Sequence, residues 1–192
     1  RVALHESERR VRSIALVHEI LSRDPSDQVP FAEIVGSLVQ MAEDSVVSSQ
    51  PIVISVNGDL GDVAADVATP LAVAVAELLQ NAVEHAFDPE AAGGDDGAAG
   101  LEGAGGGAGY APVGHVDLIM SHADSHLCVE VRDDGLGLPE GFDIEGTTSL
   151  GLSIVRDLVV SQLEGTLSMA SVPAGEGGGT RAAISVPVQA PR

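Results

Sequence analysis

The segment ELLQNAVEHAF, residues 77–87, places a carboxylate and a carboxamide one helical turn apart. In a helix, Glu77 and Asn81 share a face, and Glu84 and His85 follow on that face three and four residues later. Magnesium accepts oxygen ligands and keeps several waters, so one amide oxygen together with phosphate groups would complete a plausible shell. An exposed polar stripe on an ordinary helix would explain the pattern equally well.

A second group, VRDDGLGLP, covers residues 131–139 and follows an alternating apolar stretch. Asp133 can accept a hydrogen bond from an amino group such as that of adenine. Gly135 and Gly137 let the backbone approach a flat ligand closely. A simple tight loop is the alternative, and the glycine spacing differs from the Rossmann fingerprint.

Two further groups complete the set. Residues 146–152 precede a predicted helix whose first N–H groups and dipole can attract phosphate oxygens. Gly177, Gly178, Gly179 and Thr180 introduce the last predicted strand, where the glycines can equally form a hairpin turn. Four such groups in a fixed order are far more specific than any one of them.

Periodicity predicts the elements that position these groups. Residues 1–22 form an amphipathic helix that needs a partner helix, and a break near residue 25 separates it from a second helix over residues 30–48. The apolar face of the first helix contains Val11, Ile14, Ala15, His18 and Leu21, and that of the second contains Phe31, Ile34, Val35, Leu38 and Ala42.

The rest of the chain alternates strands with helices. We predict strands at 51–57 and near 63–67, a helix that Pro70 opens and that runs to about Phe87, paired strands at 115–120 and 127–132, a helix over 150–162, and a closing hairpin of 166–171 with 180–187. This order indicates an α/β protein, a two-layer sandwich with a mixed sheet, and argues against an all-parallel Rossmann sheet.

Composition excludes several classes of protein. The net charge is -20, from 29 acidic and 9 basic residues, and every basic residue is Arg. Nucleic-acid binding through a basic surface is therefore not expected, and the absence of Lys excludes a P-loop. Residues 88–114 consist almost wholly of Ala, Gly, Asp and Glu, which predicts a flexible insertion.

The remaining compositional features concern location. The single cysteine, Cys128, lies in an alternating stretch and is expected to be a buried structural thiol in a reducing compartment. No apolar run reaches the length of a membrane-spanning helix, and the first residues do not resemble a signal peptide. We therefore expect a cytoplasmic protein with no membrane segment in this chain.

The four groups together resemble the motifs of the sensor histidine kinase catalytic domain, a member of the wider GHKL ATPases (HATPase domains). ELLQNAVEHAF resembles the N box, VRDDGLGLP and TTSLGLSIV the two glycine boxes, and GGGTRAAISVPV the closing Gly-Thr strand. The resemblance covers about residues 50–188 and implies the Bergerat fold, with ATP held between the N-box helix and a mobile lid over residues 139–149 in which Phe142 is the aromatic residue. It also implies an ATP-binding domain over residues 25–192, preceded in 1–24 by a remnant of the dimerisation region.

The resemblance also implies roles for single residues. Asn81 would bind Mg²⁺, Glu77 would be the catalytic polar or acid/base group beside the phosphates, and Asp133 would bind the adenine amino group. Thr180 would lie near Asp133 and share a bridging water with it. The remaining ATP-binding positions would be Gly135 and Gly137 at the adenine and Gly151 and Leu152 on the phosphate side. Ser149 departs from the pattern, because many members have glycine there.

No histidine of this chain is expected to be the phosphoacceptor. RRVRSIALVHEILS, residues 9–22, resembles the second bundle helix of kinases related to the HWE type, in which the acceptor lies on the preceding helix. The interval from His18 to Asn81 is filled by other predicted elements and leaves no room for another bundle helix. His5 lies too near the start to sit inside a complete first helix, so the chain is expected to be truncated upstream and unable to autophosphorylate.

The resemblance implies a protein that transfers the γ-phosphoryl group of ATP to a histidine and onward to a response regulator, with the intact kinase a homodimer. Two alternatives remain open. One is a GHKL serine kinase of the anti-sigma kind, against which the helix at 1–22 argues. The other is a nucleotide-sensing interaction module, in which ATP changes only lid order and partner affinity.

Overall fold

The computed structural model describes residues 15, 28–45, 51–87, 113–123, 125–147 and 149–188. The helix predicted for residues 1–22 lies outside the described residues except for Ala15. The insertion predicted for residues 88–114 does so as well, except for Val113 and Gly114.

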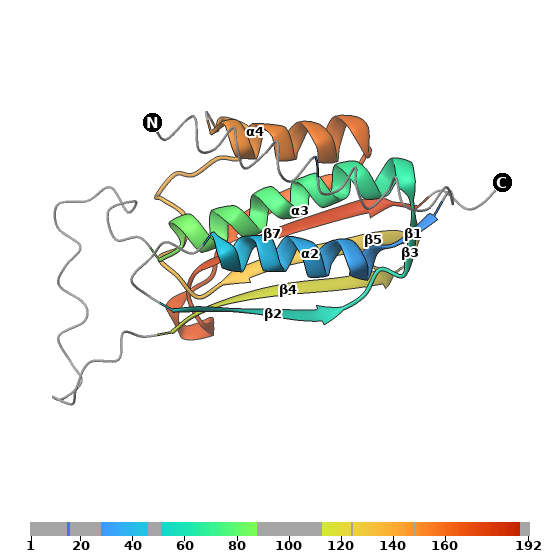
Figure 1. Cartoon of the computed structure of the whole chain (residues 1–192). Helices are drawn as coiled ribbons and strands as arrows, with labels where there is room; N and C mark the ends of the chain where they lie inside the picture. The colour runs from blue at the N-terminus through green and yellow to red at the C-terminus, as the bar shows by residue number, and fades with distance from the viewer. Residues whose placement is uncertain are drawn as a thin grey trace, which may run out of the picture.

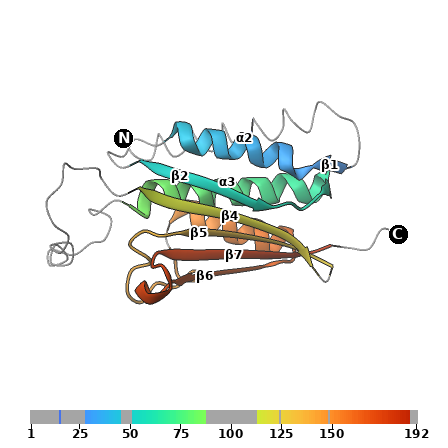
Figure 2. The ribbon, with the colours of Figure 1, turned by 90° about the horizontal axis from the view of Figure 1, so that it is seen from below.

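A five-stranded mixed sheet forms one layer of the molecule (Figure 2). Its strands, in spatial order, are β2 (Ile52–Gly58), β4 (Gly114–Ala123), β5 (His126–Asp133), β7 (Thr180–Pro187) and β6 (Thr166–Ser171). β2 runs parallel to β4, and all other neighbours are antiparallel. The predicted α/β sandwich with a mixed sheet is confirmed.

Helices cover one face of this sheet (Figure 1). They are α2 (Phe31–Asp44), α3 (Ala65–His85) and α4 (Leu150–Arg156), the last continued by a π-helical stretch, η1 (Asp157–Gln162). A short antiparallel pair, β1 (Gln28–Pro30) with β3 (Asp62–Ala64), lies beside the start of α2, and a 3₁₀ turn, η2 (Ala174–Glu176), lies between β6 and β7. No helix within the described ranges is long and apolar enough to cross a membrane.

The core lies between the helices and the sheet. All five residues of the predicted α2 stripe, from Phe31 to Ala42, are buried. α3 is buried on most of its circumference, and the many alanines there let α2 and the sheet approach it closely. Its C-terminal half nevertheless retains a polar edge, which contains Glu77, Asn81 and Glu84. That edge positions the candidate site.

Two predictions about local structure were wrong. The long helix begins at Ala65, and Pro70 is buried inside it rather than opening it. Residues 65–67 are therefore helical, and β3 ends at Ala64. Cys128 is only half-buried, on the helix-free face of the sheet beside Ser185, because β5 buries the alternate residues Leu127 and Val129 against the helices.

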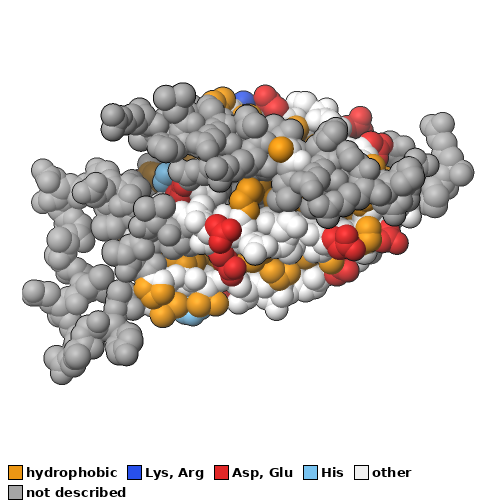
Figure 3. All heavy atoms as spheres, viewed as in Figure 1, with side chains coloured by type: hydrophobic (Ala, Val, Ile, Leu, Met, Phe, Trp, Pro, Cys, Tyr) orange, Lys and Arg blue, Asp and Glu red, His pale blue; other side chains and the backbone are white. Residues whose placement is uncertain are grey.

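Charge on the described surface is mainly acidic, as the composition predicts. In Figure 3, acidic side chains are spread over the described part of the helical face, and basic side chains are scarcely visible there. On the helix-free face, the Glu130 carboxylate forms ion pairs with Arg132 and Arg181, and its distance to Arg181 Nη2 is 2.7 Å. These two arginines are therefore engaged with a carboxylate of their own sheet.

Candidate functional site

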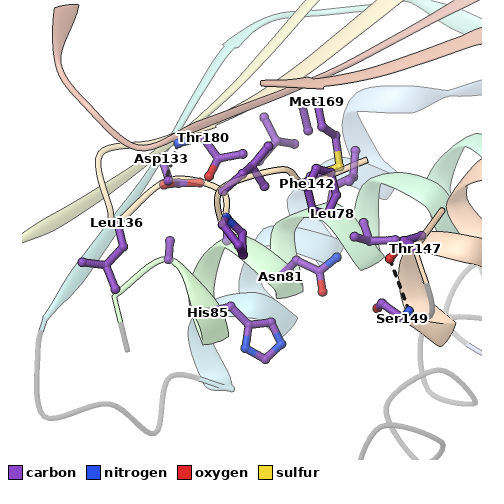
Figure 4. A pocket seen from close by; sticks show the side chains of 18 of the residues that line it. Leu78, Asn81, His85, Asp133, Leu136, Phe142, Thr147, Ser149, Met169 and Thr180 are labelled. Carbon is purple, nitrogen blue, oxygen red and sulfur yellow. Dashed lines mark hydrogen bonds between the residues drawn. The ribbon is translucent and has the colours of Figure 1, made fainter. Parts of the chain in front are cut away.

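A cavity of about 580 Å³ opens between the C-terminal half of α3, the loop after β5, the start of α4 and the ends of three strands (Figure 4). A volume of this size suits a ligand of nucleotide dimensions. Its walls combine apolar side chains with a small number of polar groups, among them Asn81, His85, Asp133, Thr147 and Thr180.

The floor of the cavity is a row of apolar residues that strand pairing brings into register. Val131 of β5 lies opposite Ala182 of β7, and Ala182 lies opposite Met169 of β6. All three line the cavity, together with Leu78 from α3. A large residue at 182 would fill the space between its neighbours, so the small alanine leaves room for a flat ligand over the row.

Asp133 ends β5 at one end of this row, and its side chain lies in the cavity wall although the residue is only 8% exposed. Its Oδ1 accepts hydrogen bonds from the backbone N–H groups of Gly135 and Thr180, both at 3.0 Å. Burial raises the pKa of the Asp133 carboxyl, and the hydrogen bonds from Gly135 and Thr180 offset part of that increase. The residue is a buried, pre-oriented acceptor.

Two glycines allow the backbone to close around this carboxylate. A Cβ on Gly135 would lie 2.1 Å from the carbonyl oxygen of Ala86, and one on Gly179 would lie 1.9 Å from that of Asp133. Gly179 also has a φ of +82°, which side chains other than glycine rarely adopt. The loop after β5 is further tied to α3, because the Leu136 N–H donates to the Ala86 carbonyl oxygen at 2.8 Å.

Asn81 projects from α3 into the cavity (Figure 4). Its amide nitrogen is buried, and it has no hydrogen-bond partner among the described residues. A buried amide left unpaired costs about 1–3 kcal/mol, and because Asn81 lines the cavity, a bound ligand could supply the missing acceptor. Glu77 lies one helical turn earlier and is half-buried, but it does not line the cavity.

The described residues after β5, 134–147 and 149, form the remaining wall without regular structure, and the lid predicted for residues 139–149 begins within this segment. Phe142 and Leu138 line the cavity from this segment. The Arg156 guanidinium of α4 donates to the carbonyl oxygen of Glu145 at 2.8 Å, and this bond fixes the end of the segment. Ser149, at the position where many members of the resembling family have glycine, is the N-cap residue of α4 and makes no side-chain capping hydrogen bond. It lines the cavity beside Thr147, whose hydroxyl oxygen accepts from the Ser149 N–H at 3.3 Å.

The structure thus brings most of the predicted site residues together. Asn81, Asp133, Gly137, Leu152 and Thr180 line one cavity. The other predicted residues do not line the cavity. Gly135 donates its N–H to Asp133, Gly151 is buried in the first turn of α4, and Glu77 lies outside the lining.

Sequence reasoning missed the apolar floor and did not assign a role to His85. The floor depends on β7 lying between β5 and β6, an order that the sequence does not specify. No cluster of three or more His, Cys, Asp or Glu residues suited to a metal ion occurs in the described part of the chain. A metal at this site would depend on Asn81 and on ligands from a bound molecule.

The sequence matches two known protein families. Residues 66–190 match the family described as histidine kinase-, DNA gyrase B-, and HSP90-like ATPase, and residues 1–46 match a histidine kinase family. The chain therefore belongs to the histidine kinase-, DNA gyrase B- and HSP90-like ATPase family.

Among curated proteins, the chain is similar to the sensor histidine kinases PdtaS of two mycobacteria. It is 43% identical to that of Mycobacterium tuberculosis over 88% of this chain and 30% of the relative. It is 39% identical to that of Mycolicibacterium smegmatis over 98% of this chain and 33% of the relative. The chain thus spans about a third of the length of these relatives.

Solved structures give the same architecture. The histidine kinase domain of a blue-light-activated histidine kinase from Erythrobacter litoralis superposes with a TM-score of 0.69 at 26% identity, covering 94% of this chain and 74% of that one. The histidine kinase AdeS of Acinetobacter baumannii matches with a TM-score of 0.59 at 15% identity, over 98% of this chain and 80% of that one, and shows the fold alone.

Proposed function

We propose that this chain is the ATP-binding catalytic part of a two-component sensor histidine kinase. The observation that carries the proposal is the buried Asp133 carboxylate at the end of an apolar floor, in a cavity that also contains the unpaired amide of Asn81. A buried acceptor over an apolar floor suits the adenine ring and its amino group, and a carboxamide suits a hydrated cation.

In this proposal the adenine lies over the row of Val131, Ala182 and Met169, with its amino group donating to Asp133. Thr180, whose N–H already bonds Asp133, holds a bridging water with its hydroxyl. Gly135 and Gly137 shape the adenine end. These assignments rest on the position of each residue in or behind the cavity wall.

The phosphate end of the nucleotide lies toward Asn81 and the start of α4. The amide oxygen of Asn81 would hold Mg²⁺, which would supply charge neutralisation to the transferring phosphoryl group. Gly151 and Leu152 form the phosphate-side turn of α4, and Glu77 acts as the polar or acid/base group beside the phosphates. The unpaired amide nitrogen of Asn81 would then be free to donate to a phosphate oxygen. Because Glu77 does not line the cavity, this role requires that the phosphates of the nucleotide reach past the lining residues.

The domain boundary proposed for the chain falls near residue 25. Residues 1–24 belong to the dimerisation region, and residues 25–192 to the ATP-binding domain, since α2 packs against α3 although it falls within the match to the second family. Residues 88–114 are proposed to be an insertion outside the site. The described residues at its two edges are close together, because a Cβ on Gly114 would lie 2.7 Å from the Phe87 ring.

For the whole protein we propose a cytoplasmic homodimeric kinase that transfers the γ-phosphoryl group of ATP to a histidine and onward to a response regulator. The match of residues 1–46 to a histidine kinase family and the names of the mycobacterial relatives support this assignment over a serine kinase of the anti-sigma kind. The acceptor histidine is proposed to lie outside this chain.

Calorimetric titration with ATP and GTP, each with and without Mg²⁺, tests the proposal. Wild-type protein is expected to bind ATP, to bind it more tightly with Mg²⁺, and to discriminate against GTP, whose ring presents a carbonyl oxygen to Asp133. Equal affinity for the two nucleotides, or no binding of either, would overturn the assignment of the cavity.

A further inference from the structure

An exposed serine that lies outside the cavity holds the loop after β5, which forms part of the cavity wall. The Leu138 N–H donates to the Ser171 hydroxyl oxygen at 2.9 Å, and the same hydroxyl donates more weakly to the Leu138 carbonyl oxygen at 3.5 Å. Leu138 lines the cavity, whereas Ser171 does not. The serine can therefore act on a bound ligand only through the backbone of the loop.

This contact is the one that ties the middle of the wall segment to the sheet. Within residues 136–147, hydrogen bonds to other elements join Leu136 to the end of α3 and the carbonyl oxygens of residues 144 and 145 to Arg156 of α4. Between these two points, the bond that the structure describes to another element is that of Leu138 with Ser171. Its loss would free the loop from β6.

The same serine also lies beside the residues that define the proposed adenine end of the cavity. It ends β6 opposite Thr180, whose N–H donates to the Asp133 carboxylate. Met169 of the apolar floor lies two residues earlier on β6, so its side chain faces the same side of the sheet as Ser171. Figure 4 shows Met169, Thr180 and Asp133 around this end of the cavity. The hydrogen bond therefore fixes the separation between the loop and the floor.

Gly137 lets the loop approach β6 closely enough for this bond. Its φ is +80°, and a Cβ there would lie 3.2 Å from the Ser171 hydroxyl oxygen and 3.2 Å from the Gly179 carbonyl oxygen. A side chain at position 137 would push the loop away from the ends of β6 and β7. The glycine permits the close approach, and the serine hydroxyl stabilises it.

We propose that Ser171 is a positioning residue for the base of the bound nucleotide, because it holds the loop at a fixed separation from the apolar floor. The inference rests on the proposed function, since it assumes that adenine lies over that floor. A wall that is already held in place loses less conformational freedom when a ligand binds. Loss of the hydroxyl should therefore weaken binding although no group that touches the ligand has changed.

Calorimetry with Mg-ATP and Mg-ADP tests the role of the hydroxyl. Ser171→Ala is expected to weaken the binding of both nucleotides by the same factor, about three- to tenfold, which is the usual effect of losing one neutral hydrogen bond. Ser171→Thr keeps the hydroxyl and suits a strand, so it should bind both nucleotides like the wild type. Amide hydrogen exchange of the ligand-free proteins should show protection of the Leu138 N–H that is lost in Ser171→Ala and kept in Ser171→Thr.

Ser168→Ala is the matched control, because it makes the same change at an exposed position of β6 on the helix-free face. It should bind both nucleotides like the wild type. Three results would overturn the role of Ser171 alone, given a wild type that binds both nucleotides: unchanged affinity in Ser171→Ala, weakening that Ser171→Thr does not reverse, or weakening confined to ATP, which would place the effect at the terminal phosphate. Failure of the wild type to bind either nucleotide would instead overturn the proposed function.

Discussion

The Asp133 carboxylate and the Thr180 backbone N–H, 47 residues apart in the sequence, are joined by a 3.0 Å hydrogen bond at the end of two neighbouring strands. The bond links the C-terminal end of β5 to the N-terminal end of β7. It holds the buried acceptor at the edge of the apolar floor, so it fixes the site before any ligand arrives. The same arrangement keeps a charge in a poorly solvated position.

Replacing Asp133 by Asn should separate binding from stability. An amide oxygen can still accept from Gly135 and Thr180, and the variant no longer buries a charge. We expect the free energy of unfolding at neutral pH to be unchanged or higher, while ATP affinity falls by about 1–3 kcal/mol. Chemical denaturation and calorimetry on the same preparations measure the two effects. A large loss of stability would show that the carboxylate itself holds the fold.

The raised pKa of Asp133 should also affect how the free energy of unfolding depends on pH. Because the pKa of Asp133 is raised in the folded protein from its ordinary value of 3.8, the folded state binds a proton more tightly than the unfolded state. The difference in unfolding free energy, wild type minus Asp133→Asn, should therefore fall as pH rises from 3.8 through the raised folded value, and then level off. Urea titrations of both proteins between about pH 3.5 and 7 measure it. A difference that grows with pH would contradict the direction of the shift.

Replacing Asn81 by Ala should likewise change ATP binding without lowering stability. Asn81→Ala removes a buried amide nitrogen that has no partner among the described residues and places a good helix former in α3. We expect Mg-ATP binding to be lost while the melting temperature stays equal or rises. Ala74→Gly, in the buried part of the same helix, is the control that should lower the melting temperature by cavity and propensity effects. Unchanged Mg-ATP affinity in a folded Asn81→Ala protein would remove Asn81 from the site.

Much of the fold could be predicted because periodicity and turn residues are local signals. The α2 stripe, the β4–β5 pairing and the β6–β7 hairpin all follow from alternation that the sequence displays directly. Pro70 misled the prediction of α3, since proline favours the first turn of a helix and here occupies a buried interior position. Cys128 was expected inside because its stretch is apolar, yet its parity places it on the opposite face from Val129.

The site was only partly predictable for a different reason. The motif residues Asn81, Asp133 and Thr180 come from segments whose resemblance to a family is plain. The floor residues Ala182 and Met169 have no motif, because their neighbourhood is created by the strand order β5-β7-β6. The parallel pairing of β2 with β4 is likewise a property of the assembled sheet.

Gly179 should be intolerant of any side chain. A Cβ there would lie 1.9 Å from the Asp133 carbonyl oxygen at a φ of +82°, so Gly179→Ala must displace the start of β7 and with it the Thr180 N–H. We expect a loss of more than about 1 kcal/mol in unfolding free energy and a parallel loss of ATP binding. Gly36→Ala is the matched control, because nothing lies within 4 Å of its Cβ and the α2 interior gains helix propensity, about 0.5–1 kcal/mol. Denaturation curves of the two variants should shift in opposite directions.

Incubation of the chain with γ-labelled ATP and Mg²⁺ is expected to leave no acid-labile label on it. The reason lies in the room around His18: only residues 19–27 separate it from β1, which pairs with β3, and α2 then packs against α3 in the sandwich. A phosphoacceptor helix needs a second helix of similar length to complete its hairpin, and that interval cannot supply one.

Of the other histidines, His115 pairs with Asp134 on the sheet, and His122 and His126 lie at the far end of the β4–β5 hairpin. The PdtaS protein of Mycobacterium tuberculosis, assayed in full length under the same conditions, serves as the positive control for detection of phosphohistidine. Label on the present chain that disappears in His18→Gln would show that the acceptor lies within residues 1–24 after all, whereas label that survives in His18→Gln and disappears in His5→Gln would move the acceptor to the earlier histidine.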